Sequence, residues 1–188
     1  MAGYTTQYPP QQSTAIASYQ YTDLEDGSGL VNYYLITRAT STGTTNHMTT
    51  ATKKPAYIVG GAEPTGDQSW DAGTYTVNGD IFNTARTVNG TALFSAYIAT
   101  TGNSSYVSVK VQKVSSGAAT DISSTIQSPA DTSNQYVNFE IPLTQTYFAA
   151  DDNIRIIVIV SGVGSYIIAD PTYATYPTTI EIPYKIDI

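Results

Sequence analysis

Apolar and polar residues alternate one by one along several stretches of this 188-residue chain. Successive side chains of a β-strand point to opposite faces, so the alternation predicts strands with one face in a core and the other toward solvent. The pattern is clearest in Tyr106 to Val114, Tyr136 to Leu143 and Ile180 to Ile188. The stretch from Ile154 to Val160 is apolar apart from one arginine, which predicts a strand covered on both faces. An all-β fold follows.

The residue types agree with this pattern. Thr, Val, Ile and the sixteen Tyr residues favour strands, whereas the long helix formers Leu, Glu, Lys and Arg are scarce. Asn78-Gly79 and Asn89-Gly90 each stand between strand formers, which predicts two tight hairpin turns. Eight to ten strands with long and short connections mixed favour a two-sheet antiparallel β-sandwich of the jelly-roll type over an up-and-down barrel.

The length fits one domain, which we place at residues 16–188. Residues 1–15 contain Gln, Thr, Pro and Tyr without an apolar period, so we predict an extended N-terminal arm there. The arm is either a disordered tail or a segment that orders against a neighbouring subunit. Pro183 cannot donate a ladder hydrogen bond, which predicts that the last strand lies at an edge or carries a bulge.

The alternating positions also predict which side chains form the core. They are the apolar members of each alternating stretch, on the faces opposite the polar members. The predicted core residues are Val107, Val109, Val111, Phe139, Ile141, Ile156, Val158, Ile180 and Ile182.

Composition excludes several classes of site. The chain has no cysteine, one histidine and a net charge of −7, which excludes disulfides, thiolate zinc sites and multi-histidine metal centres. A charge-poor acidic chain lacks the basic surface that nucleic-acid binding needs. No apolar run is long enough to span a membrane, and the N-terminus has no secretory signal pattern. His47 is expected as a solvated residue of a polar loop over residues 40–54.

Three residues are candidates for sugar chemistry. Trp70, the single tryptophan, stands among polar residues and would either stack on a sugar ring or plug one end of the sandwich. Glu140 and Glu181 alternate with apolar residues, which is typical of outward surface side chains rather than of a glycosidase pair. We therefore expect no enzymatic activity, no catalytic residue and no cofactor.

Two acidic turns are candidate calcium sites. Asp23, Glu25 and Asp26 precede a glycine, and Asp151 and Asp152 precede an asparagine. Carboxylate and amide oxygens are the ligands that Ca²⁺ prefers, but neither spacing matches the EF-hand loop. Each turn can therefore be read in two ways, as an ordinary turn with solvated carboxylates or as a structural calcium site.

Two stretches resemble parts of the jelly-roll capsid-associated proteins of tailed phages and related viruses. One runs from Tyr21 through Asp23 and Gly27 to Gly29 and enters an aromatic strand; the other comprises Asp151 to Ile156 and continues to Ile168–Pro171. The resemblance implies a decoration (cement), minor capsid or head-fibre protein, present as a homotrimer. It carries over no site residue.

The sequence thus favours a non-enzymatic virion structural protein, made in the host cytoplasm, that acts through contacts with its own copies and with the major capsid protein or another virion protein. Few charges, no cysteine and no secretion signal agree with that class. The alternative is a carbohydrate-binding β-sandwich module or adhesin stabilised by calcium, which Trp70, the tyrosines and the acidic turns would serve.

Overall fold

The computed structural model describes residues 28–40, 43–50, 68–170 and 177–186. Within these ranges every regular element is a strand, so the all-β prediction is confirmed, and no helix suited to crossing a membrane occurs in them. The predicted arm, residues 1–15, and the acidic turn at Asp23–Asp26 lie outside the described residues. The strands are β1 (Ser28–Thr40), β2 (Gly43–Thr49), β3 (Ser69–Asp71), β4 (Gly73–Ile81), β5 (Arg86–Ala99), β6 (Tyr106–Ser115), β7 (Ala118–Asp121), β8 (Ile126–Gln127), β9 (Gln135–Phe148), β10 (Asn153–Ser161), β11 (Tyr166–Ile168) and β12 (Thr179–Ile186).

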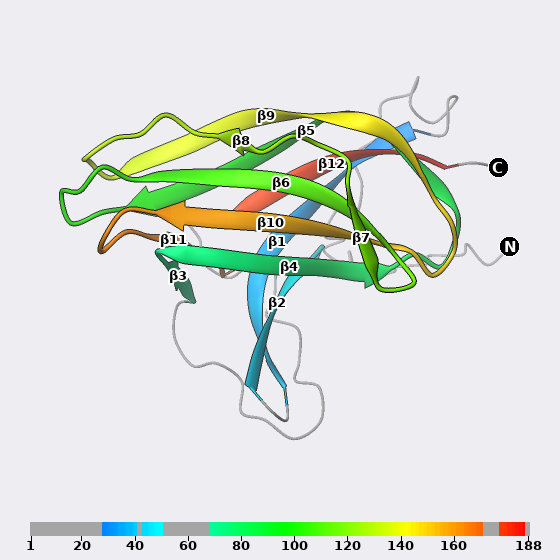
Figure 1. Ribbon diagram of the computed structural model, residues 1–188, viewed down its shortest axis with the longest axis horizontal. Helices are drawn as coiled ribbons and strands as arrows, with labels where there is room; N and C mark the ends of the chain where they lie inside the picture. The colour runs from blue at the N-terminus through cyan, green and yellow to red at the C-terminus, as the bar shows by residue number, and fades with distance from the viewer. Residues whose placement is uncertain (1–27, 41–42, 51–67, 171–176, 187–188) are drawn as a thin grey trace, which may run out of the picture.

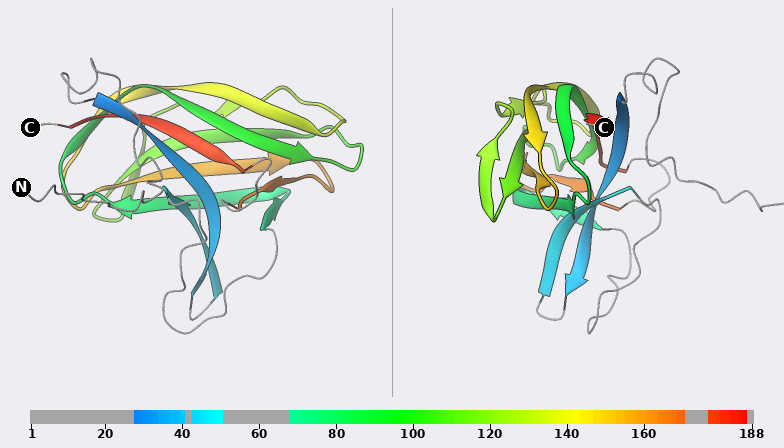
Figure 2. Two further views of the ribbon diagram at one scale, coloured as in Figure 1. Left: turned by 180° about the vertical axis from the view of Figure 1, so that it is seen from behind. Right: turned by 90° about the vertical axis from the view of Figure 1, so that its right-hand side faces the viewer.

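The strands form one hydrogen-bonded sheet in the order β3-β11-β5-β12-β1-β2-β4-β10-β6-β7, with β9 beside β5 and β8 beside β6. Every pairing is antiparallel except that of β2 with β4. Strand β9 follows β5 from Arg86 to Ile98, so β11 and β12 share the other edge of β5. The sheet curls, so β5 and β9 lie across the core from β6 and β10 (Figures 1 and 2). Hydrogen bonding is continuous because β1 and β2 connect β12 to β4, where the sequence predicted two separate sheets.

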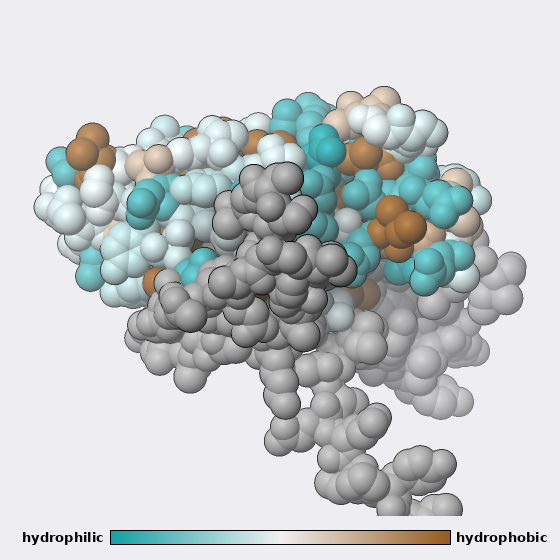
Figure 3. Space-filling model, turned by 90° about the horizontal axis from the view of Figure 1, so that it is seen from below, coloured by the Kyte–Doolittle hydropathy of each residue, from teal (hydrophilic) through white to brown (hydrophobic). Residues whose placement is uncertain are grey.

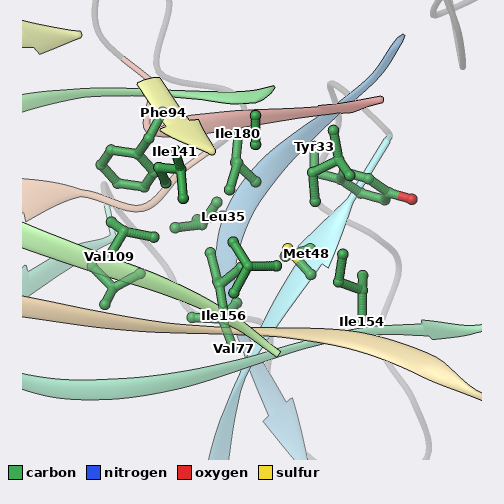
Figure 4. Packing of buried hydrophobic residues seen from close by; sticks show 14 of the residues in the cluster. Tyr33, Leu35, Met48, Val77, Phe94, Val109, Ile141, Ile154, Ile156 and Ile180 are labelled. Atoms are coloured by element: carbon green, nitrogen blue, oxygen red, sulfur yellow. The ribbon is translucent and has the colours of Figure 1, made fainter. Parts of the chain in front are cut away.

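The core lies inside this curl, and the predicted core residues are confirmed. Eight of the nine belong to the buried cluster, and Phe139 is partly buried against it. Figure 4 shows Phe94 and Ile141 on one side of the core and Val109 and Ile156 on the other. On the face shown in Figure 3, hydrophobic residues lie in small separate groups among hydrophilic ones. The apolar residues of the alternating stretches therefore pack inward, as the pattern predicted.

Both Asn-Gly pairs lie inside strands, so the predicted hairpin turns are wrong. Gly79 lies in β4 at a register shift opposite β10, and a Cβ added there would stand 3.0 Å from Ile154 Cγ2. Gly90 has φ +115° at a shift within β5, and a Cβ there would stand 3.4 Å from the Pro183 ring. Both pairs lie at β-bulges, where glycine allows a positive φ or a close approach of the neighbouring strand.

The last strand is internal. Strand β12 lies between β1 and β5, and its register with β5 shifts between Glu181 and Tyr184. Between the pairs that these two residues form with β5 stand two residues of β12 but four of β5, so the extra residues lie in β5, and the pairing of β12 with β1 is regular through Pro183. Pairing is thus irregular next to Pro183, but β12 itself carries no extra residue, and the alternative of an edge strand is wrong. Strand β10 also differs from the prediction, because its burial alternates and its outward residues Ile157 and Ile159 are only half-buried.

Residues 43–49 form β2, which pairs with β1 in a hairpin that extends beyond the rest of the sheet (Figures 1 and 2). The predicted loop over residues 40–54 is therefore wrong in its central part. Threonine is a good strand former when a partner strand is present, and Met48 opposite Leu35 gives the hairpin an inner, buried pair. His47 is half-buried in this strand, opposite Ile36 and beside Asn78.

Candidate interaction face

Trp70 is buried and cannot serve as a sugar platform. It is 2% exposed, its Nε1–H donates a 2.7 Å hydrogen bond to Thr37 Oγ1, and its ring stacks on Tyr75 with centroids 4.8 Å apart. Short strand β3 holds it in place by pairing with β11. The sequence left two interpretations open for Trp70, a sugar platform and a structural plug. Its burial supports the structural plug.

The turn at Asp151 and Asp152 is present, with Asp151 at φ 72°. One carboxylate oxygen of Asp152, Oδ2, lies 3.0 Å from Lys113 Nζ and accepts a 2.8 Å hydrogen bond from the Ala149 amide. Burial would raise the pKa of Asp152, but hydrogen bonds from Ser115, Lys113 and the Ala149 amide outweigh it and hold the pKa below its usual value. These donors make Asp152 a structural anchor between β9, β10 and β6.

Replacing Asp152 with Asn should lower the free energy of unfolding at neutral pH by about 1.5–3 kcal/mol, because hydrogen bonds to a buried charge are lost. A carboxylate with a depressed folded pKa stabilises the fold above its unfolded pKa of about 3.9 and loses that contribution as the pH falls through the folded pKa. Urea unfolding of both proteins from neutral to acidic pH should therefore show the difference shrinking toward acid. The neighbouring Asp151→Asn variant is the control, since Asp151 is exposed and Asn also tolerates a positive φ.

Calcium binding has no support in the described part of the chain. No group of three or more His, Cys, Asp or Glu residues comes together there. The first acidic turn, Asp23–Asp26, lies outside the described residues.

A group of tyrosines stands on the outer face of the curled sheet. Tyr97 of β5 lies directly opposite Tyr136 of β9, and Tyr166 of β11 lies opposite Ala99, two residues further along β5. Their inward neighbours, among them Ile98, are buried, so the tyrosines point outward. Tyr136 is 55% exposed and Tyr166 38%. Directly opposite residues on adjacent strands have Cβ atoms only about 5 Å apart, so Tyr97 and Tyr136 form one aromatic surface.

Carboxylates flank these tyrosines on the same face. Glu140 of β9 and Glu181 of β12 lie on either side of Leu93 of β5, and Asp71 of β3 lies opposite Tyr166. Two strand spacings separate the α-carbons of the two glutamates by about 10 Å. Both stand on the outer face, as the alternation predicted; Glu140 is exposed and Glu181 is half-buried. We call the outward side chains of this region the tyrosine face; its members are Tyr97, Tyr136, Tyr166, Asp71, Glu140 and Glu181.

Hydrogen bonds between three loops hold the end of the sheet next to the tyrosine face. The Thr100 amide donates to Asn134 Oδ1 over 2.8 Å, and Asn103 Nδ2 donates to the Val163 carbonyl over 2.9 Å. The backbones of Ser105 and Asp131 bond each other in both directions. Residues 100–105, 131–134 and 161–165 are thereby joined, which fixes the ends of β5, β9 and β11 that carry the tyrosines.

The cations with described side chains lie elsewhere. Lys110 pairs with Asp121 at 3.0 Å, Lys113 pairs with Asp152, and Arg155 donates to Asn78. Arg86 and Lys185 lie at the other end of β5 and β12. Among the described side chains, the tyrosine face therefore carries negative charge only, and none of its three carboxylates is ion-paired to a described residue.

Sequence reasoning missed this face as a unit. The alternation in β9 places Tyr136 on the same side as Glu140, and that signal was available. The positions of Tyr97 opposite Tyr136, and of Glu181 opposite Leu93, depend on the register between strands, which the sequence did not reveal.

Comparison with known proteins finds similarity in fold alone. No family model and no curated protein matches the chain. A CocE/NonD family hydrolase from Staphylococcus aureus is similar with a TM-score of 0.57 and 10% identity over 86% of this chain and 37% of that one. An alpha-amino acid ester hydrolase is similar with a TM-score of 0.56 and 11% identity over 82% of this chain and 36% of that one. The chain thus spans little more than a third of either protein.

These comparisons correct the resemblance to phage jelly-roll proteins, which is wrong. The fold is similar to parts of hydrolases, and the two stretches that suggested a capsid protein do not identify one. The physical reason is that the second stretch is a turn, strand β10 and the short strand β11, whose composition any antiparallel fold can share.

Proposed function

We propose that this protein is a non-enzymatic structural protein that acts through contacts with partner molecules. The observation that carries the proposal is the tyrosine face, an exposed aromatic and acidic surface on strand ends that hydrogen-bonded loops hold in place. Tyrosine is enriched at protein interfaces because its ring buries area while its hydroxyl keeps a hydrogen bond. Asp121 and Asp152 form ion pairs, and Asp131 and the buried Asp170 accept hydrogen bonds from backbone amides. Glu140 and Glu181 stand on either side of Leu93, about 10 Å apart. None of these arrangements resembles a general acid with a nucleophile.

A virion is the setting that composition favours for such a protein, as a decoration, minor capsid or head-fibre component. Few charges, no cysteine and abundant Thr, Ser and Tyr support it. In this proposal the curled sheet works as a two-layer jelly roll, and the chain assembles with its own copies, a trimer being the expected state. Residues 1–15 would bind a neighbouring subunit or the major capsid protein by strand addition.

Measurements on the full-length chain test the proposal. Light scattering should give a homo-oligomer, and the protein should bind purified capsids. Deleting residues 1–15 should leave the thermal unfolding midpoint unchanged and weaken assembly or capsid binding, because contacts spread along the segment are lost together. Hydrolysis of aminoacyl esters or peptides should be undetectable. Turnover that disappears on changing one described Asp or Glu would refute the proposal, as would a monomer that leaves capsids unbound.

Carbohydrate binding is the second candidate function, and Tyr136 next to Tyr97 is the observation that favours it. The exposed ring of Tyr136, next to the half-buried Tyr97, can stack on a sugar ring, and Asn138, exposed on the same face of β9, offers an amide for hydroxyl groups. Titration of the full chain with oligosaccharides such as chitohexaose tests this function. Loss of binding in Tyr136→Ser, without loss in Trp70→Phe, would support it.

A further inference from the structure

We propose that the tyrosine face is the docking surface for an extended, Lys- or Arg-bearing segment of a partner protein. This inference rests on the proposed function, since it names the chemistry of the partner that such a structural protein would contact. Two independent observations carry it, which are the sign of the charges on this face and the geometry of its aromatic rings.

Charge complementarity is the first observation. Glu140, Glu181 and Asp71 stand on the face without an ion pair to a described residue, while the described lysines and arginines lie on β6, on β10 or at the far end of β5 and β12. Opposite charges across an interface steer association and fix orientation, whereas like charges oppose it. A cationic partner therefore fits this face better than an anionic or neutral one.

The aromatic geometry is the second observation. Tyr97 and Tyr136 are direct neighbours across β5 and β9, and Tyr136 is more than half exposed. The face of an aromatic ring attracts a Lys ammonium or, more often, an Arg guanidinium. Rings and carboxylates on one surface thus offer both of the groups to which a guanidinium binds well.

The spacing favours an extended partner. Tyr136 and Glu140 lie four residues apart on one strand, on the same side, so about 14 Å separates their α-carbons. An extended segment running beside β9 repeats this spacing, and two of its cations four residues apart would meet the ring and the carboxylate together. A helical segment rises only about 6 Å over the same four residues and would not match.

The chain supplies a matched control. Tyr147 lies on the same strand β9, and its exposed fraction of 55% equals that of Tyr136. It stands in a row with Thr87 and Lys185, so its surroundings are cationic instead of acidic. A general contribution from exposed tyrosines would affect both positions, whereas the proposed docking requires Tyr136 alone.

The test uses fluorescein-labelled peptides of alternating Arg and Ser, Lys and Ser, or Glu and Ser, and follows their anisotropy as the full-length protein is added. The Arg peptide should bind, the Lys peptide should bind more weakly and the Glu peptide should not bind. Raising the salt from about 20 mM to about 300 mM should weaken binding, because the Debye length shortens. Tyr136→Ser should reduce the affinity about 2–5-fold. The double variant Glu140→Lys/Glu181→Lys should reduce it about 10-fold or more. Tyr147→Ser should leave it unchanged.

Several results would overturn the inference. One is an equal loss of affinity for the Arg peptide in Tyr136→Ser and Tyr147→Ser, and another is full affinity in the glutamate variants. Binding of chitohexaose but not of the Arg peptide, or self-association that these variants abolish, would also contradict it. If circular dichroism shows that the charge-reversed double variant Glu140→Lys/Glu181→Lys is unfolded, Glu140→Gln, which keeps the shape of the side chain, is used in its place. If the variants bind capsids as the unaltered chain does, the inference fails and the proposed function stands. If the unaltered chain binds the Arg peptide but no capsid, the proposed virion function fails and the docking inference stands.

Discussion

Val109→Asp is expected to abolish the folded state. Val109 is fully buried in β6, between Val158 of β10 and Ile126 of β8. The change loses about 1.5–3 kcal/mol of apolar burial and places a carboxylate where no described cation faces it, which costs several kcal/mol more. A domain has only about 5–15 kcal/mol of stability, so the variant should be unfolded or insoluble. Far-UV circular dichroism of the soluble fraction and urea unfolding measure this.

Thr76→Asp is the control for this experiment. Thr76 is exposed on the outer face of β4, next to buried Val77, so the same new charge stays in water. Its unfolding midpoint should lie close to that of the unaltered protein, within about 0.5 kcal/mol. A soluble Val109→Asp protein with an unchanged midpoint would show that the inner face of β6 is not in the core.

Trp70→Ala should have the next largest effect, a loss of about 3–5 kcal/mol in the free energy of unfolding. The indole is almost completely buried, stacks on Tyr75 and donates to Thr37 Oγ1, so its removal leaves a cavity and an acceptor without its donor. The cavity would lie where β3 and β4 meet β1 of the projecting hairpin. Urea unfolding followed by circular dichroism measures the loss, because the variant has no tryptophan fluorescence.

Two further variants separate the contributions at this position. Trp70→Phe keeps most of the ring and loses the hydrogen bond, so it should cost about 1 kcal/mol from that bond and less in total than the alanine variant. Tyr166→Ala removes an exposed ring from the neighbouring strand β11 and should change stability little. If Trp70→Ala is as stable as Tyr166→Ala, the tryptophan is not a structural plug.

The alternation of apolar and polar residues determined most of what was predicted correctly. It identified the strands over residues 106–114, 136–143 and 180–186 and the core residues on them, because a strand places alternate side chains on opposite faces whatever its neighbours are. The missing N–H of Pro183 likewise predicted irregular pairing at this position, because it is a local property of the chain, although the extra residues lie in the partner strand β5.

Features that depend on which strands become neighbours were decided by the tertiary structure. Asn78-Gly79 and Asn89-Gly90 became bulges instead of turns, because the partner strands gave their backbones more favourable pairing than a reversal of the chain would. Trp70, which stands among polar residues in the sequence, is buried because β3 pairs with β11 and the indole N–H donates to the Thr37 hydroxyl. The tyrosine face exists only where the register sets Tyr97 opposite Tyr136 and Leu93 between two glutamates. The sequence by itself determined which residues form strands and which side of each strand is apolar, because those are local properties. Register, strand order and the curl of the sheet decided which outward side chains meet, because they arise from contacts between residues far apart in the chain.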